Sequence, residues 1–479
     1  MIKKCLLIIG FSVISGLGCL AQVVSLDSCR HLALNNNKTL KIADEAIVGA
    51  SYTKKAAHAA YLPGVDFTGT YLYNQHKIEL LGADAMLPTM SFDPATGKFN
   101  YNILTAPDGT PVKDPSTGSY IPTEVAVIPK DAMSFDVHNV FAGAFTLTQP
   151  IYMGGQIRAL NEIAHYGEEL AKTSRKVAEQ ELVYGVDEAY WLVVSLKEKE
   201  KLAVSFEGLV DSLRNNVNAL LNNGMATKSD LLTVEVKLNE AKIAVTKVTN
   251  GLSLARMALA QMCGLPVDQP MILADEVSLS GTSSAVADSY NMQDVYARRQ
   301  DLELIRKSIL MLEGKEKLSL STLLPKIVAV GTYSFSNPNL IHGFEKRFGG
   351  GFSVGAALTI PIWHWGGNYN QYKAAKSATI SQRLLLEDAE EKVELQVNQA
   401  RFKFQEAYKT YDMTVSNMEK ANENLRQAQL GYKEGVLTVD DVTAAQTAWL
   451  QAQSEKLDAE IGIRLCNVYL AKVLGLMEY

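Results

Sequence analysis

Two short segments of the chain share one pattern of residues whose side chains have distinct chemical roles. Each contains a glycine, a threonine three residues later and an aspartate three residues after that: Gly224, Thr227, Asp230 and Gly435, Thr438, Asp441. A glycine permits the left-handed turn that ends a helix. A threonine side chain can cap the helix that follows, and an aspartate is favourable in its first turn. Both segments are therefore predicted to be turns between helices, with Ser229 as an alternative cap in the first.

No spacing in the sequence indicates a catalytic site, a metal site or a phosphate-binding loop. The seven histidines show neither paired nor HExxH spacing: His31, His58, His76, His138, His165, His342 and His364. The 46 Lys and Arg residues against 52 Asp and Glu give a net charge of −6 without a basic block. Nucleic-acid-binding proteins normally carry a basic face. We therefore expect no enzyme activity, no cofactor, no metal and no nucleic-acid partner.

The first residues have the features of an export signal. Lys3 and Lys4 precede an apolar run from Cys5 to Leu20 that is too short and glycine-rich for a spanning helix. This pattern predicts a signal peptide over residues 1–21. Processing as a lipoprotein at Cys19 is the alternative, although the usual large aliphatic residue upstream is missing. No later apolar run reaches about 18 residues, so the chain is predicted to cross the inner membrane without staying in it.

Three cysteines follow the predicted signal peptide: Cys29, Cys263 and Cys466. An odd number cannot pair completely within one chain, and their spacing resembles no disulfide framework. We interpret them as small buried residues in helices.

The distribution of proline predicts two long helical hairpins. None of the 14 prolines lies between residues 151 and 265 or after residue 361, and proline breaks helix interiors. Each stretch has one break near its middle, at Gly224 and at Gly435. A helical arm of about 65 residues would be about 100 Å long. Apolar residues recur at coiled-coil spacing without a strict heptad, so the arms are predicted to need neighbouring helices.

The chain contains an internal duplication. A shift of 211 residues takes Gly224 to Gly435, and a shift of 262 takes Pro63 to Pro325. The difference of 51 residues predicts an insertion in the first half, between Tyr73 and Leu147. We therefore divide the chain into a first repeat over residues 22–274, a linker over 275–290 and a second repeat over 291–479. Each repeat is expected to contain a helix, a strand pair and a helical hairpin, with a long loop over residues 74–139 in the first.

Four segments alternate apolar with small or polar residues: Val65–Tyr73, Val140–Gln149, Ile327–Phe335 and Phe352–Ile360. This alternation is typical of strands in a membrane barrel, and a half-buried soluble hairpin is the alternative. Four strands are fewer than the roughly eight that close a barrel, and open edges cannot lie in lipid. Membrane strands would therefore require several chains. The 74–139 loop would lie outside the cell, as a solvated loop or as a plug or receptor segment.

The order and spacing of several motifs resemble the TolC-like outer membrane efflux protein family, the outer membrane factor of tripartite efflux and type I secretion systems. The motifs that carry the resemblance are Leu26-Asp27-Ser28-Cys29, Tyr61-Leu62-Pro63, Gln149-Pro150-Ile151-Tyr152 with Gly154-Gly155, Gln300-Asp301-Leu302, Leu324-Pro325, Pro361-Ile362-Trp363 with Gly366-Gly367, and Gly435 through Asp441. The resemblance implies an α+β membrane protein. Its duplicated helical hairpins would form an α-barrel, and each chain would add four strands to a trimeric twelve-stranded outer-membrane β-barrel.

The resemblance further implies a passive exit duct in the cell outer membrane, with a helical tunnel in the periplasm. Its partners would be two further copies of the chain, outer-membrane lipid, a periplasmic adaptor protein and an inner-membrane pump. The adaptor would contact the hairpin tips at Gly224, Thr227, Gly435 and Thr438. An exported coiled-coil scaffold or adhesion protein is the alternative, which explains the helices but not the strands. Drug efflux, metal efflux and polypeptide secretion are not distinguished.

Roles for three tip residues also follow from the resemblance. Three copies of Asp441 would form a carboxylate ring at the periplasmic entrance, which favours cations over anions. Ala444 replaces the family's second aspartate and should weaken this ring. Asp230 and Tyr432 occupy the positions of a link between tips in the closed state, where Leu437 replaces the usual arginine. Helix initiation alone is the alternative role of both aspartates.

Overall fold

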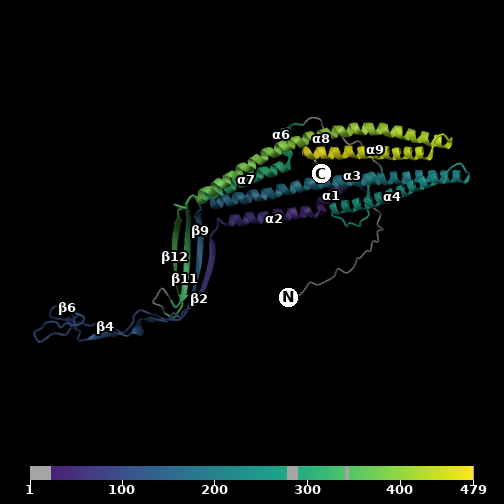
Figure 1. Cartoon of the computed structure of the whole chain (residues 1–479). Helices are drawn as coiled ribbons and strands as arrows, with labels where there is room; N and C mark the ends of the chain where they lie inside the picture. The colour runs from purple at the N-terminus through teal and green to yellow at the C-terminus, as the bar shows by residue number, and fades with distance from the viewer. Residues whose placement is uncertain (1–22, 278–289, 340–344, 478–479) are drawn as a thin grey trace, which may run out of the picture. The chain divides into compact units, whose positions relative to one another are not determined.

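The computed structural model describes residues 23–277, 290–339 and 345–477 (Figure 1). The predicted signal peptide, with Cys19, and most of the predicted linker lie outside these residues. The contacts divide the chain into two units. One is helical and contains residues up to 57, 159–317 and 370 onward, and the other is built on a β-sheet and contains residues 58–158 and 318–369.

The helices repeat with the spacing predicted from the sequence. The outgoing helices of the two hairpins, α3 (Gln156–Asn222) and α8 (Gly367–Lys433), each have 67 residues. The returning helices, α4 (Lys228–Met262) and α9 (Val439–Val473), each have 35. A shift of 211 residues superimposes both pairs of bounds. A shift of 262 does the same for α2 (Lys38–Ala59) and α7 (Gln300–Ser321). The internal duplication is thus confirmed at the level of helices.

The predicted arm length is therefore right for the outgoing helices and wrong for the returning helices, which are about half as long as their partners. A second helix continues the line of each returning helix along the long one (Figure 1). Where α4 ends and α2 begins, the Asn37 side chain donates to the Met262 carbonyl at 2.9 Å. Gly264 ends α4 with φ +70°, and a Cβ atom there would lie 2.5 Å from Asn36 Cβ. Only glycine therefore permits this close joint between the two helices. The joint uses α1 (Leu26–Asn36) as well.

The second repeat builds the same joint from different residues. Arg299, which lies between α6 (Met292–Arg298) and α7, donates to the Val473 carbonyl at 3.1 Å. Gly475 has φ +69°, and a Cβ atom there would lie 2.9 Å from Arg298 Cβ. Both repeats therefore have a glycine at this joint, whereas the side chain that donates the hydrogen bond is asparagine in the first repeat and arginine in the second.

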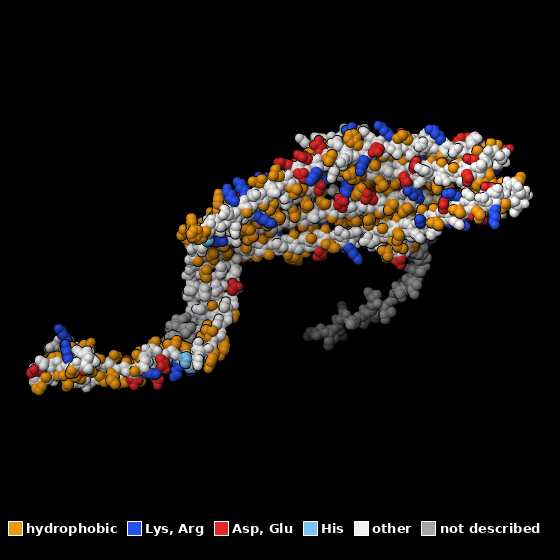
Figure 2. Space-filling view, in the orientation of Figure 1, with side chains coloured by type: hydrophobic (Ala, Val, Ile, Leu, Met, Phe, Trp, Pro, Cys, Tyr) orange, Lys and Arg blue, Asp and Glu red, His pale blue; other side chains and the backbone are white. Residues whose placement is uncertain are grey.

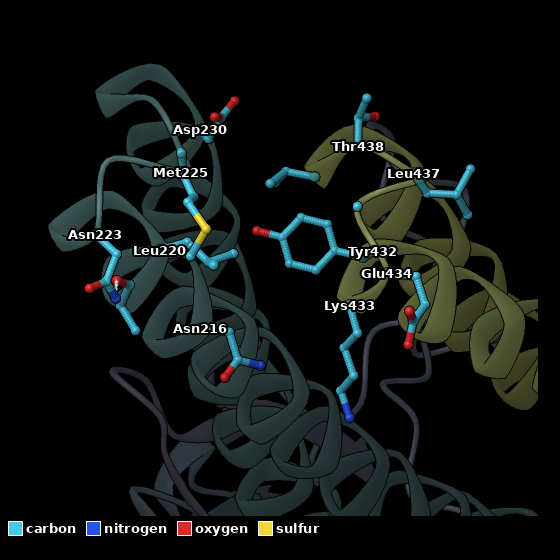
Figure 3. Close-up of a pocket in the computed structure, with 14 residues that line it drawn as sticks. Asn216, Leu220, Asn223, Met225, Asp230, Tyr432, Lys433, Glu434, Leu437 and Thr438 are labelled. Atoms are coloured by element: carbon cyan, nitrogen blue, oxygen red, sulfur yellow. Dashed lines mark hydrogen bonds between the residues drawn. The ribbon is translucent and has the colours of Figure 1, made fainter.

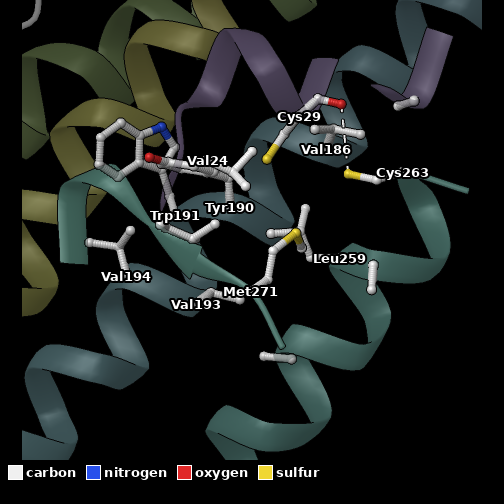
Figure 4. Packing of buried hydrophobic residues seen from close by; sticks show 14 of the residues in the cluster. Val24, Cys29, Val186, Tyr190, Trp191, Val193, Val194, Leu259, Cys263 and Met271 are labelled. Atoms are coloured by element: carbon white, nitrogen blue, oxygen red, sulfur yellow. Dashed lines mark hydrogen bonds between the residues drawn. The ribbon is translucent and has the colours of Figure 1, made fainter. Parts of the chain in front are cut away.

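Apolar side chains form three clusters within the helical unit. One lies around α1, α3 and the end of α4, and it includes Cys29, Tyr190 and Cys263 (Figure 4). A second joins the two hairpins near their tips, and a third joins α7, α8 and α9. The prediction that the long arms need neighbouring helices is confirmed by this packing. Short helix α5 (Ala274–Val277) and a parallel pair of two-residue strands, β1 (Val23–Val24) and β10 (Ile272–Leu273), lie beside the first cluster.

The other unit contains one antiparallel sheet of four long strands, in the order β12-β11-β9-β2. The strands are β2 (Gly64–Tyr73), β9 (Asn139–Tyr152), β11 (Lys326–Asn337) and β12 (Gly349–Thr359). All four predicted strands are therefore present. Among the described residues, β2 and β12 each pair on one side only, so the sheet has two open edges.

The register places unlike residues on the two faces of this sheet. Phe67, Phe145, Tyr333 and Phe352 form one row across the four strands, and Asp66, Thr146, Thr332 and Ser353 form the next row, on the opposite face. The four aromatic side chains of the first row are all exposed in the single chain. We call the side that carries this row the apolar face of the sheet.

The insertion in the first repeat, predicted as a loop, contains short paired strands. Strand β4 (Ala85–Pro88) pairs with β7 (Val125–Ile128), β5 (Met90–Asp93) with β6 (Lys98–Tyr101), and β3 (Ile78–Glu79) with β8 (Ser134–Phe135), which a short 3-10 helix (Lys130–Met133) precedes. Two similar turns follow aspartates in it. Asp93 accepts from the Ala95 N–H and Asp114 from the Ser116 N–H, each at 2.9 Å. Side-chain hydrogen bonds of this kind stabilise turns locally.

Candidate functional site

The turn at the tip of the first hairpin follows the predicted use of glycine. Gly224 has φ +74°, and its N–H donates to the Leu221 carbonyl at 2.9 Å. The next N–H, of Met225, donates to the Leu220 carbonyl at 2.9 Å. This pair of hydrogen bonds is the Schellman motif, which satisfies the last carbonyls of a helix.

The tip of the second hairpin has the same turn. Gly435 has φ +72° and donates to the Tyr432 carbonyl at 3.0 Å, while Val436 donates to the Gly431 carbonyl at 2.8 Å. A Cβ atom at either Gly224 or Gly435 would meet nothing within 4 Å. Backbone conformation, and not lack of space, is therefore the reason for glycine at both tips.

Each returning helix begins with a capping box. Thr227 Oγ1 accepts from the Asp230 N–H at 3.2 Å, and Asp230 Oδ2 accepts from the Thr227 N–H at 2.8 Å. Thr438 and Asp441 repeat these contacts at 3.2 and 2.9 Å. The Thr438 hydroxyl also donates to the Asp441 carboxylate at 2.7 Å. Thr227, not Ser229, is therefore the cap of the first returning helix.

These hydrogen bonds stabilise the charged form of both aspartates. The Thr227 backbone N–H, then its side chain, hold the pKa of Asp230 below its ordinary value. The Thr438 side chain, then its backbone N–H, do the same for the pKa of Asp441. The Asp441 side chain is exposed, and the Asp230 side chain is half-buried. Each tip therefore carries a carboxylate that stays ionised to lower pH than an isolated one.

An open cleft of about 760 Å³ lies between the two tips and brings Asp230, Tyr432 and Thr438 to its walls. The Tyr432 ring reaches from the second tip toward Leu220 and Met225 of the first (Figure 3). Burial, and then the charge of Asp230, raise the pKa of Tyr432 above its ordinary value. Among the described residues no hydrogen bond joins Asp230 to Tyr432 within the chain. The predicted link between tips stays a prediction.

The structure adds residues to the cleft that were not predicted as site residues, among them three beside the tip glycines. Met225 follows the tip glycine, and Lys433 and Glu434 precede the other one. Their position beside Gly224 and Gly435 could have predicted them, because a side chain next to the turn of one hairpin can face the tip of the other hairpin.

The described residues contain no group of three or more His, Cys, Asp or Glu side chains arranged to hold a metal ion. Within the same part of the chain, none of the helices combines the length and the apolar character needed to cross a membrane.

The model of the outer membrane efflux protein family matches residues 291–476 of the chain. The fold is similar to that of CusC, with a TM-score of 0.71 and 14% identity over 97% of this chain and 95% of that one. It is similar to VceC, an outer membrane protein of Vibrio cholerae, with a TM-score of 0.69 and 14% identity over 94% and 96%. For the MtrE outer membrane channel of Neisseria gonorrhoeae the TM-score is 0.69, with 17% identity over 94% and 88%. No curated protein matches the chain.

Proposed function

We propose that the protein is a passive trimeric exit duct of the outer membrane, because residues 291–476 match the model of the outer membrane efflux protein family and the fold is similar to that of channels such as MtrE. Three chains would each add four strands to one twelve-stranded barrel, and their helices would form a tunnel through the periplasm. Substrates would reach the tunnel from an inner-membrane pump through a periplasmic adaptor. The export signal (1–21) and the two repeats (22–274 and 291–479) are part of this proposal.

The observation that carries the proposal is the four-stranded sheet with an apolar face and two open edges. In the part of the chain that the structure describes, aromatic side chains along this face are exposed, and Phe352 reaches 83%. An apolar face of this kind is stable against lipid, but unpaired edges are not, because lipid offers no hydrogen bonds to backbone groups. Pairing β12 of one chain with β2 of the next would remove every open edge.

Helix α8 supports the same assembly. Its apolar side chains Leu395, Phe402 and Met413 are exposed in the single chain, although they lie on a helix whose other side packs against α7 and α9. Apolar side chains gather on the surface of the helical unit (Figure 2), and contiguous exposed apolar patches normally mark an interface. We assign it to the neighbouring chain in the tunnel.

The hairpin tips would then lie together at the periplasmic end. We propose that Gly224, Thr227, Gly435 and Thr438 belong to the surface that contacts the adaptor. Three Asp441 carboxylates would ring the entrance and favour cations. Asp230 of one tip and Tyr432 of a neighbouring tip would form the link that holds the entrance closed.

The first test is the mass of the protein extracted from membranes in mild detergent, measured by light scattering with the detergent subtracted. A species of three chains, released from the outer membrane fraction and forming channels in planar bilayers, supports the proposal. A water-soluble monomer or dimer would overturn it and favour the exported coiled-coil scaffold.

The entrance ring has its own test in the same bilayers. Asp441→Asn keeps a side-chain oxygen for the capping box but removes the charge, so cation selectivity should fall without loss of trimer. Asp412→Asn removes one charge from the exposed surface of α8, away from the tip, and serves as the matched control. Unchanged selectivity of the Asp441→Asn channel would leave helix capping as the only role of Asp441.

A further inference from the structure

Two cysteines that are distant in sequence meet in the core of the helical unit. Cys29 lies on α1 and Cys263 ends α4, 234 residues apart. The Cys263 thiol donates to the Cys29 carbonyl, with Sγ and O at 3.6 Å. Both side chains are completely buried, and both sulfur atoms lie within one apolar cluster (Figure 4).

The two thiols are close enough to affect each other's ionisation. The Cys263 thiol and then burial raise the pKa of Cys29, while the Cys29 thiol lowers the pKa of Cys263 against the effect of burial. The two thiol groups, and not only the Cys263 thiol and the Cys29 carbonyl, are therefore neighbours.

Polar contacts hold both cysteine-bearing segments in place. Arg30, the next residue after Cys29, binds the buried Asp187 carboxylate through Nε at 2.7 Å and Nη2 at 2.6 Å. On the other side, Asn37 binds the carbonyl of Met262, the residue before Cys263. The two backbones therefore cannot move apart without breaking one of these contacts.

The second repeat shows that the joint does not need cysteines. The shifts of 262 and 211 residues take Cys29 to Asn291 and Cys263 to Leu474, and Leu474 is buried at the equivalent helix end. A small buried residue would serve packing at both positions of the first repeat. The occurrence of two cysteines at one contact therefore needs an explanation beyond packing.

We propose that Cys29 and Cys263 form a disulfide bond that links α1 to the end of α4 in the exported protein. The two thiols give up two protons and two electrons as the S–S bond forms. A disulfide-bearing thiol oxidase of the exporting compartment accepts them, and its own disulfide becomes two thiols. Because both sulfurs are buried in the folded chain, the bond forms while α1 docks onto α3 and α4. Cys466 is partly exposed, with its thiol against the Lys403 carbonyl, and it stays reduced.

The inference rests on export, as the proposed function requires, and peptide mapping tests it on the unmodified chain. The protein is isolated from its membrane fraction, denatured in N-ethylmaleimide without reductant and cleaved after Lys and Arg. This cleavage places the three cysteines on separate peptides, which end at residue 30 or span 257–298 and 465–472. The expected result is one species that joins the Cys29 and Cys263 peptides, together with an alkylated Cys466 peptide. Reduction before alkylation should release both linked peptides.

Two variants make the assignment specific. Cys29→Ala should leave Cys263 fully alkylated, whereas Cys466→Ala should leave the linked species unchanged. Alkylation of both Cys29 and Cys263 in the unmodified chain would overturn the disulfide even if the protein is a trimer of the outer membrane fraction. A chain recovered from the cytoplasm, by contrast, would overturn the proposed function itself.

Discussion

Trp191 on α3 and Phe402 on α8 occupy equivalent positions in the two repeats, since a shift of 211 residues takes one to the other. Trp191 is 8% exposed, and the Arg464 guanidinium from α9 lies 4.5 Å from the centre of its ring. Phe402 is 69% exposed. The same helix position is thus covered by the chain itself in the first repeat and left open in the second.

The same contrast holds for charge. Asp187 on α3 is completely buried and paired with Arg30, while its equivalent on α8, Asn398, is exposed and polar. The core around α3 is therefore completed within the chain, partly by α9 of the second repeat. The equivalent surface of α8 is left open, and we assign it to a neighbour in the proposed trimer. The two copies of an internal duplication can therefore have helices of equal length and still differ in which helix faces are buried.

The strongest test of this difference is a charge on the open surface of α8. Phe402→Asp should prevent assembly, because a carboxylate buried without a partner costs several kcal/mol, on the order of 3 or more, at each contact between chains. Light scattering in detergent should then give the mass of one chain. Asn398→Asp adds the same charge one turn earlier at a polar position, and should leave the trimer intact. A trimeric Phe402→Asp protein would remove α8 from the proposed interface.

Removal of the buried carboxylate should affect the first repeat alone. Asp187→Ala leaves the Arg30 guanidinium without its main partner, and we expect the free energy of unfolding to fall by about 3 kcal/mol. Asn398→Ala at the equivalent position should change it by less than about 0.5 kcal/mol. Denaturant unfolding followed by circular dichroism measures both. Equal effects would mean that the two positions are equally buried in the assembly.

Substitution of the tip glycine should lower stability by the same amount in both repeats. Gly224→Ala and Gly435→Ala each place a Cβ atom in the left-handed region, which costs about 1–2 kcal/mol. Gly208, an exposed glycine inside α3, is the matched control, because alanine there should stabilise the helix by about 0.5–1 kcal/mol. Thermal unfolding of the three variants gives the comparison, and a much larger loss at one tip would show that it packs more tightly in the assembly.

Acid should weaken both tips by a small amount. The folded-state pKa values of Asp230 and Asp441 are lowered, so their contribution to stability is complete above the ordinary carboxyl pKa. It is lost as the pH falls through the lower folded values. A chain carrying both Asp230→Asn and Asp441→Asn should therefore lose less stability than the unmodified chain between pH 5 and pH 2. Parallel curves for the two proteins would contradict this account of the capping boxes.

Much of the fold was predictable because it depends on local rules. The absence of proline from residues 151–265 predicted a long helical hairpin there. Gly224 predicted the tip of this hairpin, and Gly435 predicted the tip of the second one. Thr227 and Ser229 were equal candidates for the first cap, and only the structure distinguishes them. The short strands of the 74–139 insertion were missed, because runs of four residues between prolines carry too little alternation to be recognised.

The sequence by itself determined the lengths of the outgoing helices, the tip turns, the four strands and the duplication, because proline, glycine and side-chain alternation act on the backbone within a few residues. Tertiary structure decided that Arg30 meets Asp187, that Cys29 meets Cys263 and that Trp191 is covered while Phe402 is not. These contacts join segments more than 150 residues apart in the first two cases. The spacing of residues along the chain does not predict which distant helix will pack against a given helix, because that depends on how all the helices pack together.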